Sequence, residues 1–372
     1  MGQDVVVIGA GPAGSYCAYL LARAGARVLL LEKARLPRDK VCAGGVSAGA
    51  RSLLGFEISH LVKSETDRAT IAFSERRRKV FLPVTVGCTV ERREFDYFLA
   101  EKAAGAGAKI MDCQKVISVS GAISPEVRTE KETYHCDFAI LAAGSVSGIN
   151  PRLRFETARR FALGVTSTLP REKVSREEFL FDFAAVPCGY GWVFPKGDKV
   201  SIGVYSLRVR GRKLLSHFLR FLSRCTDSRE RVRLRVAPIA LPSAPRRFGE
   251  RILPVGDSFG AADPFMGKGV YGALKTAILA ADAIISSPQN AAASYLNSAG
   301  AHLDDMLFSF SLSRLFYSQQ EFVYETLMRL PAVLTSFSAA VADITTYRGT
   351  FVRSLAGLGV LPFPFPEERR SS

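Results

Sequence analysis

The sequence predicts an α/β fold: a Rossmann-type domain with a parallel sheet, an antiparallel-sheet domain interleaved with it, and a C-terminal helical region. Three observations carry this prediction. Residues 5–32 read as strand, glycine turn, helix and strand, residues 155–240 are dominated by strand-forming runs, and residues 290–360 are apolar-rich with helical spacing. Strands that alternate with helices favour a parallel sheet, whereas consecutive strand runs favour an antiparallel one.

The individual elements follow from local patterns. The first unit has a β-branched apolar run at 5–8, apolar residues at helical spacing over 13–23, and a second apolar run at 28–31. The further elements expected are a loop at 37–50, a hairpin at 69–84, an amphipathic helix at 91–108, strands at 109–113 and 136–144, strand runs at 161–168, 177–183, 190–195 and 200–206, a helix at 212–224, a strand at 251–257, a helix at 268–286 and a helical tail broken at Pro331.

Composition limits the class of protein. A chain of 372 residues with 48% hydrophobic and 23% charged residues can bury a sizeable core and is typical of a folded globular protein. The net charge of +15, with a pI near 9.7, favours anionic partners. Because the basic residues are scattered and not interleaved with aromatic ones, a membrane surface or a diphosphate ligand is favoured over nucleic acid.

Cysteine usage and hydropathy suggest the compartment. The seven cysteines form an odd set without a CxxC pair, and there are four histidines, which disfavours a disulfide framework and a metal site. The first strand is expected within a few residues of Met1, so no signal peptide is expected, and no apolar run reaches the roughly 18 residues that a membrane-spanning helix needs. We therefore expect a cytoplasmic protein, and any membrane contact would be peripheral, on the inner face of the cell membrane.

The first chemical motif is the glycine turn "GAGPAG" followed by an acid. Gly9 permits the tight turn from strand to helix, Gly11 lets a pyrophosphate approach the backbone, and Gly14 allows the helix to pack closely on the strand. The helix N-terminus offers free N–H groups to phosphates, and Glu32 at the end of the second strand can accept hydrogen bonds from ribose hydroxyls. The alternative, a glycine-rich turn in an unrelated α/β domain, is disfavoured by the order of the elements. The neighbouring positions also expected to bind the dinucleotide are Pro12, Ala13 and Lys33.

A second motif, "RILPVGDSFGAADPFMGKGVYGALKTA", indicates which dinucleotide is bound. A strand ends at Asp257, and after a loop Gly267 and Gly269 open the long helix expected at 268–286, with Val270 also expected to contact the cofactor. This arrangement is similar to FAD-dependent oxidoreductases of the aromatic-hydroxylase type, whose Asp holds the ribityl chain while the helix points at the flavin. A helix N-terminus there stabilises the negative charge of reduced flavin. The alternative is that Asp257 caps a helix and the glycines serve turns.

With both motifs in place, the chain resembles the geranylgeranyl reductase family. The segments "EKARLPRDKVCAGGVS", "VERREFDYFLAEKAAGAGA", "PCGYGWVFPKGDKVSIGV" and "GDSFGAADPFMGKGVYGALKTA" occur in the family's order and approximate spacing, over roughly residues 1–290. The resemblance implies a flavoprotein of lipid biosynthesis that saturates isolated double bonds of prenyl chains in archaeal lipids, chlorophyll side chains and related isoprenoids.

The resemblance also assigns the cysteine loop. Cys42 matches the cysteine that faces the flavin, and Arg92, or Arg93 in another register, matches the arginine that lies along FAD. Cys42 is the candidate catalytic residue, with a packing cysteine or a thiol that gates the flavin as alternatives. The family's proton donor is left unassigned. The other positions assigned by the resemblance are Ala43, Gly44, Ala143 and Gly144 for the cofactor and Gly45 for the substrate.

An aromatic stretch is expected to line the substrate cavity. Tyr190, Trp192, Phe194 and Pro195 match the family's YxWxFP pattern, and Trp192 is the single tryptophan of the chain. A flat aromatic wall gives an isoprenoid a large apolar contact at low entropic cost. The alternative is that Trp192 is a core residue of a sheet strand.

Two departures from the family pattern affect the prediction. Ala143 stands before Gly144 where the family and the aromatic hydroxylases usually have an acidic residue, and the cysteine loop reads CAGG rather than CGGG. The first departure weakens a monooxygenase interpretation and leaves the reductant open among NADPH, NADH and ferredoxin. Since no second GxGxxG unit follows the first, no separate pyridine-nucleotide domain is expected.

The sequence thus predicts an FAD-dependent prenyl reductase with an isoprenoid or prenylated-lipid substrate, an electron donor as partner, and a monomeric state. In the implied reaction, reduced FAD gives a hydride to one alkene carbon while a proton adds to the other. The competing functions are an FAD-dependent monooxygenase or halogenase, and an FAD-binding protein without catalysis. The expected domains are 1–60, 89–150 and 250–290 for FAD, 61–88 and 151–249 for the antiparallel substrate domain, and 291–372 for the helical region.

Overall fold

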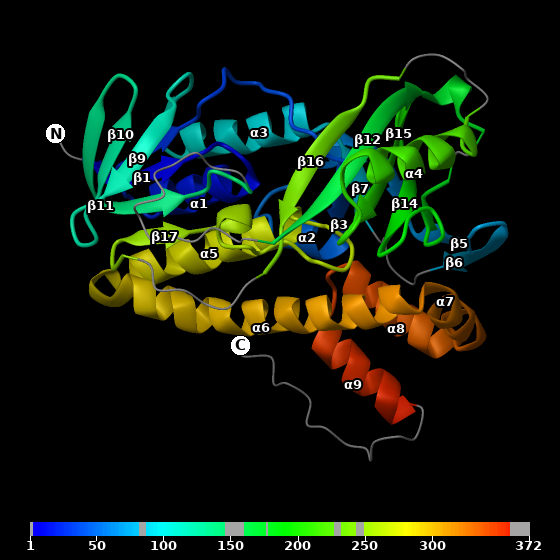
Figure 1. Ribbon diagram of the computed structural model, residues 1–372. Helices are drawn as coiled ribbons and strands as arrows, with labels where there is room; N and C mark the ends of the chain where they lie inside the picture. The colour runs from blue at the N-terminus through cyan, green and yellow to red at the C-terminus, as the bar shows by residue number, and fades with distance from the viewer. Residues whose placement is uncertain are drawn as a thin grey trace.

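The structure is a computed structural model that describes residues 3–81, 87–145, 160–175, 178–226, 232–242 and 249–357 (Figure 1). Within these residues the strands form two large sheets and one small sheet. The first large sheet follows the order β8, β2, β1, β11, β10 and β9, and β17 also pairs with β11. Its strands are β1 (Gln3–Ile8), β2 (Val28–Leu31), β8 (Lys109–Met111), β9 (Val116–Ser120), β10 (Glu126–Thr129), β11 (Thr133–Leu141) and β17 (Ile252–Pro254).

The centre of this sheet is parallel and covered on both faces. Val5 and Val7 of β1 face a core formed with three helices, while Val6 and Ile8 pack against side chains of β9 and β10. A parallel strand buried on both faces reads as a continuous apolar run, which explains the sequence pattern at 5–8. The helices on the first face are α1 (Pro12–Arg23), α3 (Arg92–Gly105) and α5 (Val270–Ser286).

The second large sheet is mostly antiparallel, in the order β16, β12, β15, β14, β13, β5 and β6. Helix α4 (Gly211–Ser223) packs on one face through Phe218 and Phe221. Along β14, Val193 belongs to that core, whereas Tyr190, Trp192 and Phe194 face the other side. The strands are β5 (Arg68–Phe73), β6 (Arg76–Phe81), β12 (Phe161–Pro170), β13 (Leu180–Asp182), β14 (Gly189–Lys196), β15 (Lys199–Ser206) and β16 (Arg235–Ala240).

A small sheet and a short helix connect the two large sheets. Strand β7 (Gly87–Val90) lies between β3 (Gly45–Ser47) and β4 (Val62–Thr66), and α2 (Ala48–Ser52) follows β3. The boundary expected at 88/89 divides β7, and the one at 60/61 falls within the turn before β4. The expected division would therefore assign the strands of this one small sheet to different domains, and the domain boundaries stay a prediction. In the part of the chain that the structure describes, short 3₁₀ helices complete the connections: η1 (Ser59–Leu61), η2 (Arg171–Lys173), η3 (Gly256–Ser258) and η4 (Pro288–Asn290).

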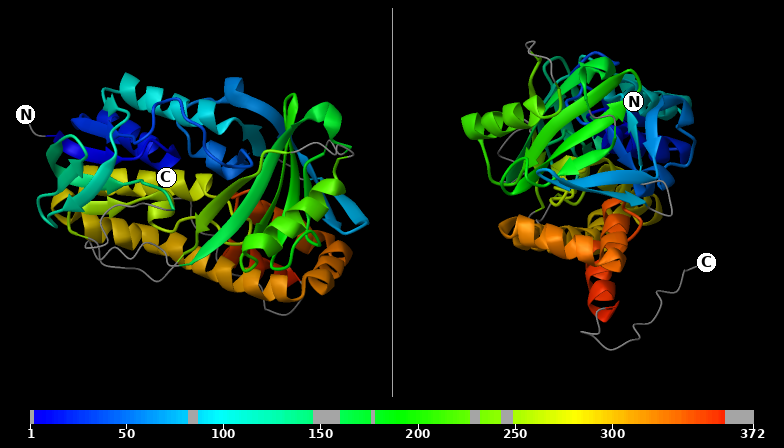
Figure 2. Two further views of the ribbon diagram at one scale, coloured as in Figure 1. Left: turned by 45° about the horizontal axis from the view of Figure 1, so that its top comes forward. Right: turned by 90° about the vertical axis from the view of Figure 1, so that its right-hand side faces the viewer.

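The C-terminal helices bind both halves of the molecule. Helix α6 runs along one side from the first sheet to the second, as the two turned views show (Figure 2). Near its start the Tyr295 hydroxyl donates to the carbonyl of Pro254 at the end of β17, and near its end Tyr317 donates to Phe265 before α5. These helices are α6 (Ala291–Ser318), α7 (Gln320–Arg329), α8 (Pro331–Val341) and α9 (Tyr347–Gly357).

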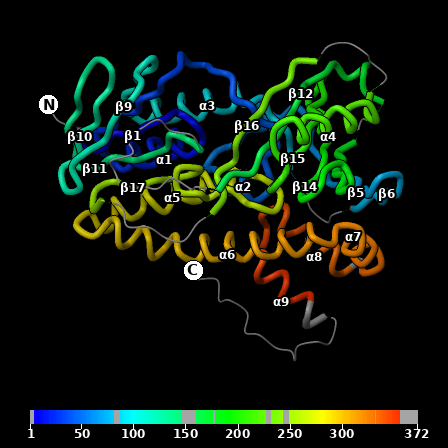
Figure 3. Tube along the Cα trace, viewed as in Figure 1, coloured from blue at the N-terminus to red at the C-terminus, as the bar shows by residue number. Residues whose placement is uncertain are grey.

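The trace in Figure 3 shows the hairpin β5 and β6 beside α7 at one end of the molecule. Arg76 on β6 forms ion pairs with Glu321 and Glu325 on α7. None of the described helices is long and apolar enough to cross a membrane.

The predicted fold class is confirmed, with differences at particular elements. The long helix expected from residue 268 begins at Val270, with Gly269 as its N-cap and Gly267 in a turn with a positive φ of 66° before it. The tail breaks at Pro331 as expected and also between Ser318 and Gln320. Strands β9, β10 and β16 and the small sheet were not predicted. Parts of three expected elements lie outside the described residues: 82–84 of the hairpin, 177 of a strand run and 358–360 of the tail.

Candidate active site

A cavity of about 710 Å³ lies where the two large sheets and α5 meet. One part of its lining comes from the glycine turn after β1, the loop after β2 and the end of β11. The other part comes from β13, β14 and β16 of the antiparallel sheet. The carboxyl ends of parallel strands are the usual place for a ligand in an α/β sheet, so the cavity lies where the fold predicts one.

The glycine turn has the geometry of a dinucleotide cradle. Gly9 has φ of 105°, and a Cβ there would lie 2.5 Å from the carbonyl oxygen of Ala142 on the neighbouring strand. A Cβ on Gly14 would lie 1.9 Å from the carbonyl oxygen of Gly9, so helix and turn are in direct backbone contact. At Gly11 the nearest atom to such a Cβ is 3.7 Å away, and no side chain caps α1. The first N–H groups of α1 are therefore open to an anion.

The acid at the end of β2 is buried in a charged cluster. Glu32 accepts hydrogen bonds from the backbone N–H of Ala10 at 2.9 Å and of Ala34 at 3.0 Å. Arg38 forms ion pairs with Glu32 and with Asp96 of α3, each at 3.2 Å, and donates to the carbonyl of Ala10. These contacts lock the turn, the loop and α3 together, and Glu32 still lines the cavity.

Arg92 lies beside the cysteine loop at the start of α3. Its guanidinium binds both carboxylate oxygens of Asp96, at 2.7 and 2.9 Å, a bidentate geometry that fixes its plane. Burial lowers the pKa of Arg92, but Asp96 and the nearby Cys42 outweigh it and raise the pKa overall, so the side chain stays charged. Cys42 lines the cavity, and its Sγ accepts a hydrogen bond from the N–H of Gly44 at 3.3 Å.

The second predicted motif forms another wall of the cavity. Asp257 lines it after β17, and its carboxylate lies 3.3 Å from the position that a Cβ on Gly269 would take. Burial raises the pKa of Asp257, while the charges of Lys40 and Arg92 oppose that rise. Gly269 is the N-cap of α5 and has no side-chain hydrogen bond to satisfy the first N–H groups of the helix.

The loop that leads into α5 is held from several sides. Tyr205, Tyr317 and Tyr190 donate hydrogen bonds of 2.6 to 2.7 Å to three successive carbonyls, those of Pro264, Phe265 and Met266. The three tyrosines come from β15, α6 and β14. The backbone before α5 is thus fixed by both the antiparallel sheet and the tail helices.

Aromatic side chains form the far wall of the cavity. Tyr190, Trp192 and Phe194 alternate along β14 and all line the cavity, and Phe179 and Phe181 add to them. The ring centroids of Trp192 and Phe194 are 6.3 Å apart, and those of Phe181 and Phe194 are 5.2 Å apart. The Trp192 indole N–H donates to Ser201 Oγ at 3.2 Å, which satisfies the polar edge of the ring. The remaining surface is a large apolar wall.

The structure brings most of the predicted positions to this one cavity. Arg92 lines it, whereas Arg93 is half exposed and pairs with Asp39. The predicted residues in the lining are Gly9, Gly11, Pro12, Ala13, Glu32, Lys33, Cys42, Ala43, Gly45, Arg92, Ala143, Gly144, Tyr190, Trp192, Phe194, Asp257, Gly267, Gly269 and Val270.

Three predicted residues lie behind the lining. Gly14 packs against Gly9, and Gly44, with φ of 88°, lies against the carbonyl of Val90. Pro195 faces away from the cavity because side chains alternate along β14, and its carbonyl accepts a hydrogen bond from Thr89 at 2.6 Å. These three residues shape the site through the backbone.

Several lining residues were not predicted from the sequence. Arg38 is one of several basic residues in its segment, Lys268 stands between the two recognised glycines Gly267 and Gly269, and Phe179 and Phe181 precede the recognised aromatic stretch. The alternation of Phe179, Phe181 and Phe183 along a short strand could have indicated a shared aromatic face. The position of Lys268 within the glycine motif could have indicated it, whereas no local pattern distinguishes Arg38.

Comparison with known proteins identifies the family. Residues 3–183 match the family described as FAD binding domain. The chain is 32% identical over 303 residues to digeranylgeranylglycerophospholipid reductase 2 of Methanothermobacter thermautotrophicus, covering 76% of this chain and 77% of that protein. The chain belongs to the geranylgeranyl reductase family. A menaquinone reductase of Mycolicibacterium smegmatis is 30% identical over 318 residues, covering 76% of each protein.

Solved structures agree with the fold of this family. A geranylgeranyl bacteriochlorophyll reductase-like protein from Thermoplasma acidophilum superposes with a TM-score of 0.77 at 20% identity, over 96% of this chain and 99% of that one. The halogenase PltM superposes with a TM-score of 0.71 at 18% identity, over 96% of this chain and 84% of that one. At these identities the two superpositions describe the fold.

As a member of the geranylgeranyl reductase family, the protein is a flavin-dependent oxidoreductase that acts on carbon–carbon double bonds, and its cofactor is FAD. The residues of the cavity fit that cofactor. The cradle at Gly9, Gly11 and Gly14 has no room for side chains at its packed positions, and the uncapped N-termini of α1 and α5 both border the cavity.

Proposed function

We propose that this enzyme saturates isolated double bonds of a geranylgeranyl-type chain carried by a lipid, a diphosphate, or a quinone- or chlorophyll-like molecule. The observation that carries the proposal is a continuous cavity, lined at one part by the glycine turn and Glu32 and at another by Tyr190, Trp192 and Phe194. A dinucleotide suits the first part and an apolar chain suits the second. The names of the relatives support a prenylated-lipid substrate for this chain.

FAD, when bound, supplies the hydride for such a reduction. The role of this chain is to hold the cofactor and the alkene in reacting geometry. The glycine turn and α1 would hold the pyrophosphate, Glu32 the ribose, and Asp257 the ribityl chain. With the cofactor fixed in this way, most of the rate enhancement expected from the protein comes from proximity and orientation.

The aromatic wall would hold the prenyl chain against the cofactor and keep water out. An unactivated alkene has no carbonyl that a hydrogen-bond donor could polarise, so stabilisation must come from positioning and from a dry environment. Trp192 and Phe194 offer rigid apolar surface, and Gly45 brings the cysteine loop within 3.7 Å of the Phe194 ring, measured from the position of a Cβ.

Cys42 is the proposed catalytic residue of the loop. Its Sγ accepts the N–H of Gly44, and the charged Arg92 lies near it. A thiol at this place in the cavity can influence how a proton reaches the second alkene carbon. We propose that role for Cys42, and gating of the flavin is the alternative that the same position supports.

The electron donor and the location in the cell belong to the proposal as well. NADPH, NADH or ferredoxin would reduce the flavin directly. The net charge of +15 supports peripheral contact with an anionic membrane on its cytoplasmic face, where prenylated lipids reside.

An anaerobic assay with different prenyl carriers tests the proposal. The enzyme, kept reduced with dithionite, is incubated with geranylgeranyl diphosphate, a digeranylgeranyl glycerophospholipid or menaquinone. The masses of the products are then measured by mass spectrometry. The proposal expects at least one carrier to gain two hydrogen atoms for each double bond reduced. It is wrong if no carrier changes without oxygen and the reduced enzyme instead hydroxylates or halogenates an aromatic compound once air and halide are admitted.

A further inference from the structure

Lys268 is a charged residue of the cavity wall to which neither the motifs nor the family resemblance gives a role. It stands between Gly267 and Gly269 at the N-terminus of α5, and its side chain lines the cavity. The side chain is 22% exposed, so the ammonium borders the space in which the cofactor is proposed to lie.

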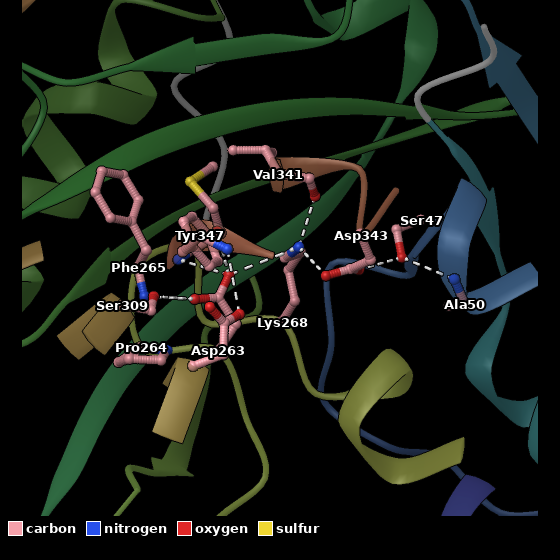
Figure 4. A network of polar contacts seen from close by, with 12 residues as sticks. Ser47, Ala50, Asp263, Pro264, Phe265, Lys268, Ser309, Val341, Asp343 and Tyr347 are labelled. Carbon is pink, nitrogen blue, oxygen red and sulfur yellow. Dashed lines mark hydrogen bonds and ion pairs between the residues drawn. The ribbon is translucent and has the colours of Figure 1, made fainter. Parts of the chain in front are cut away.

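The ammonium of Lys268 is held by the tail of the protein. Its Nζ donates to the carbonyl of Val341, the last residue of α8, at 2.6 Å and to Asp343 Oδ1, in the turn after α8, at 2.7 Å. A second carboxylate, that of Asp263, lies 3.6 Å away (Figure 4). The side chain therefore has a fixed position rather than a set of solvated rotamers.

Both carboxylates are themselves fixed. Asp343 accepts a hydrogen bond of 2.5 Å from Ser47, the last residue of β3 in the small sheet. Asp263 accepts from Ser309 of α6, from the Tyr347 hydroxyl of α9 and from the N–H of Phe265. The network in Figure 4 thus joins the loop before α5, the segment of β3 and α2 that follows the cysteine loop, and the tail helices.

We infer that Lys268 and Asp343 together set how strongly this site prefers reduced over oxidised FAD. When FAD gains two electrons and one proton, its charge becomes more negative by one unit. A fixed ammonium next to the uncapped N-terminus of α5 stabilises that added charge, and a fixed carboxylate behind the ammonium opposes it. The inference rests on the proposed placement of the flavin ring beside α5.

The two residues of the ion pair therefore have opposite effects on the flavin, although they hold one another in place. Removing the charge of Lys268 lowers the preference for reduced FAD, whereas removing the charge of Asp343 raises it. If the ion pair only stabilised the loop before α5, removing either residue would loosen that loop in the same way. Both variants would then shift the flavin potential in the same direction. This difference in sign separates an electrostatic role from a structural one.

The test is a redox titration of the holoenzyme against a reference dye. Lys268→Met is expected to reduce the preference for reduced FAD by about tenfold, which lowers the midpoint potential by about 30 mV for a two-electron couple. Lys268→Gln is expected to shift the potential in the same direction, and Lys268→Arg, which keeps the charge, to leave it unchanged. Asp343→Asn is expected to raise the potential.

Lys115→Met is the matched control. Lys115 is also a lysine in the cavity lining with a carboxylate partner, Glu130 at 3.1 Å, but it is 62% exposed and follows Gln114, whose N–H donates to the carbonyl of Glu32. Its replacement is expected to leave the potential unchanged, since it lies in the dinucleotide-turn part of the cavity. A shift as large as that of Lys268→Met would overturn the inference, because net charge alone would then explain the result.

Three further outcomes would overturn the inference. The first is an unchanged potential in Lys268→Met and Lys268→Gln, and the second is a shift in the same direction for Lys268→Met and Asp343→Asn. Loss of flavin from Lys268→Arg and Lys268→Met alike would also count against it, because shape rather than charge would then be the requirement. The titration needs no prenyl substrate, so failure of the proposed reaction would not be mistaken for failure of this inference.

Discussion

Trp192 owes its position to a glycine on the neighbouring strand. Residues Trp192 and Gly203 are directly paired between β14 and β15, and the indole ring occupies the space above Gly203. A Cβ on Gly203 would lie 2.2 Å from the ring and 2.6 Å from the carbonyl oxygen of Val165. The flat aromatic wall therefore depends on Gly203, a residue without a side chain, in the adjacent strand β15.

Replacement of Gly203 tests this dependence. Gly203→Ala is expected to displace the Trp192 ring and raise KM for a prenyl substrate by about tenfold, which corresponds to about 1.4 kcal/mol of lost binding. The control is Gly105→Ala at the end of α3, because a Cβ there meets no atom within 4 Å and the residue lies outside the cavity lining. KM and flavin content are measured for both variants, and equal KM values would show that the position of Trp192 does not matter.

His302 makes the stability of the protein sensitive to acid. Burial lowers the pKa of His302 to about 4 from 6.5, although a hydrogen bond to Ala261 opposes part of this effect. The Nε2 atom has no hydrogen-bond partner among the described residues, and the ring packs on Tyr271 at 6.0 Å. Between pH 6.5 and 4 the unfolded chain takes up a proton that the folded protein excludes, so the free energy of unfolding falls as the pH falls.

Denaturant unfolding at a series of pH values checks this behaviour. The histidine is expected to account for at most about 3 kcal/mol of lost stability between pH 6.5 and 4. His302→Leu is expected to flatten the pH dependence in this range, whatever its stability at pH 8. If the variant and the original protein have parallel curves, His302 is not the titrating group.

At the scale of elements, the turn from β1 to α1 is the part of the site that the sequence predicts best. Its geometry is local, since Gly9 and Gly14 are in contact although they are only five positions apart, and the turn stands directly between β1 and α1. The same is true of the turn into α5. A motif whose members lie close together in the chain can be recognised without knowledge of the remaining fold.

Gly14→Ala tests the close contact between α1 and the turn. The added methyl group would lie 1.9 Å from the carbonyl oxygen of Gly9, so the turn must move. FAD is expected to bind about ten- to a hundredfold more weakly, as expected for 1–3 kcal/mol of overpacking. FAD affinity is measured by flavin fluorescence.

The control for this variant is Gly300→Ala in α6. A Cβ on Gly300 meets no atom within 4 Å, and the helix should gain about 0.5–1 kcal/mol of stability from the change. Its FAD affinity should equal that of the unchanged protein. Unaltered FAD binding in Gly14→Ala would refute the assignment of this turn to the cofactor.

Elements that depend on distant partners were harder to predict. Strand β16 lies at the edge of its sheet and contains Pro238, which is tolerated at an edge but breaks a strand pattern in the sequence. Strands β3, β4 and β7 are short, and each is stabilised by neighbours from other segments. The same reason explains Arg38 and Lys268, whose partners Asp96 and Asp343 lie 58 and 75 residues away in the chain.

At the scale of the whole molecule, the tail helices complete both the fold and the site. The ring of Phe316 in α6 packs on the ring of Phe183, which follows β13 of the antiparallel sheet, with centroids 5.2 Å apart. It also packs on the ring of Phe265 in the loop before α5, with centroids 4.9 Å apart. The tail thus contacts the two parts of the protein that meet at the cavity. The sequence predicted a helical tail, but not that its side chains would fix the loop that leads into α5.

Two phenylalanines of the tail provide a matched comparison of stability. Phe316 is 5% exposed, and Phe316→Ala is expected to lower the free energy of unfolding by about 3–5 kcal/mol. Phe322 on α7 is 70% exposed, and Phe322→Ala is expected to change it by less than about 0.5 kcal/mol. Denaturant unfolding measures both. Similar losses in the two variants would contradict the proposed docking of α6.

The central claim is that FAD and a prenyl chain share one cavity and react there. The most direct measurement is a single turnover without oxygen: the flavin is reduced, excess reductant is removed, and a prenyl substrate is added while flavin absorbance and product mass are followed. We expect the flavin to be reoxidised and one double bond to be saturated for each flavin. Flavin that stays reduced until air is admitted, with an oxygenated product appearing then, would contradict it.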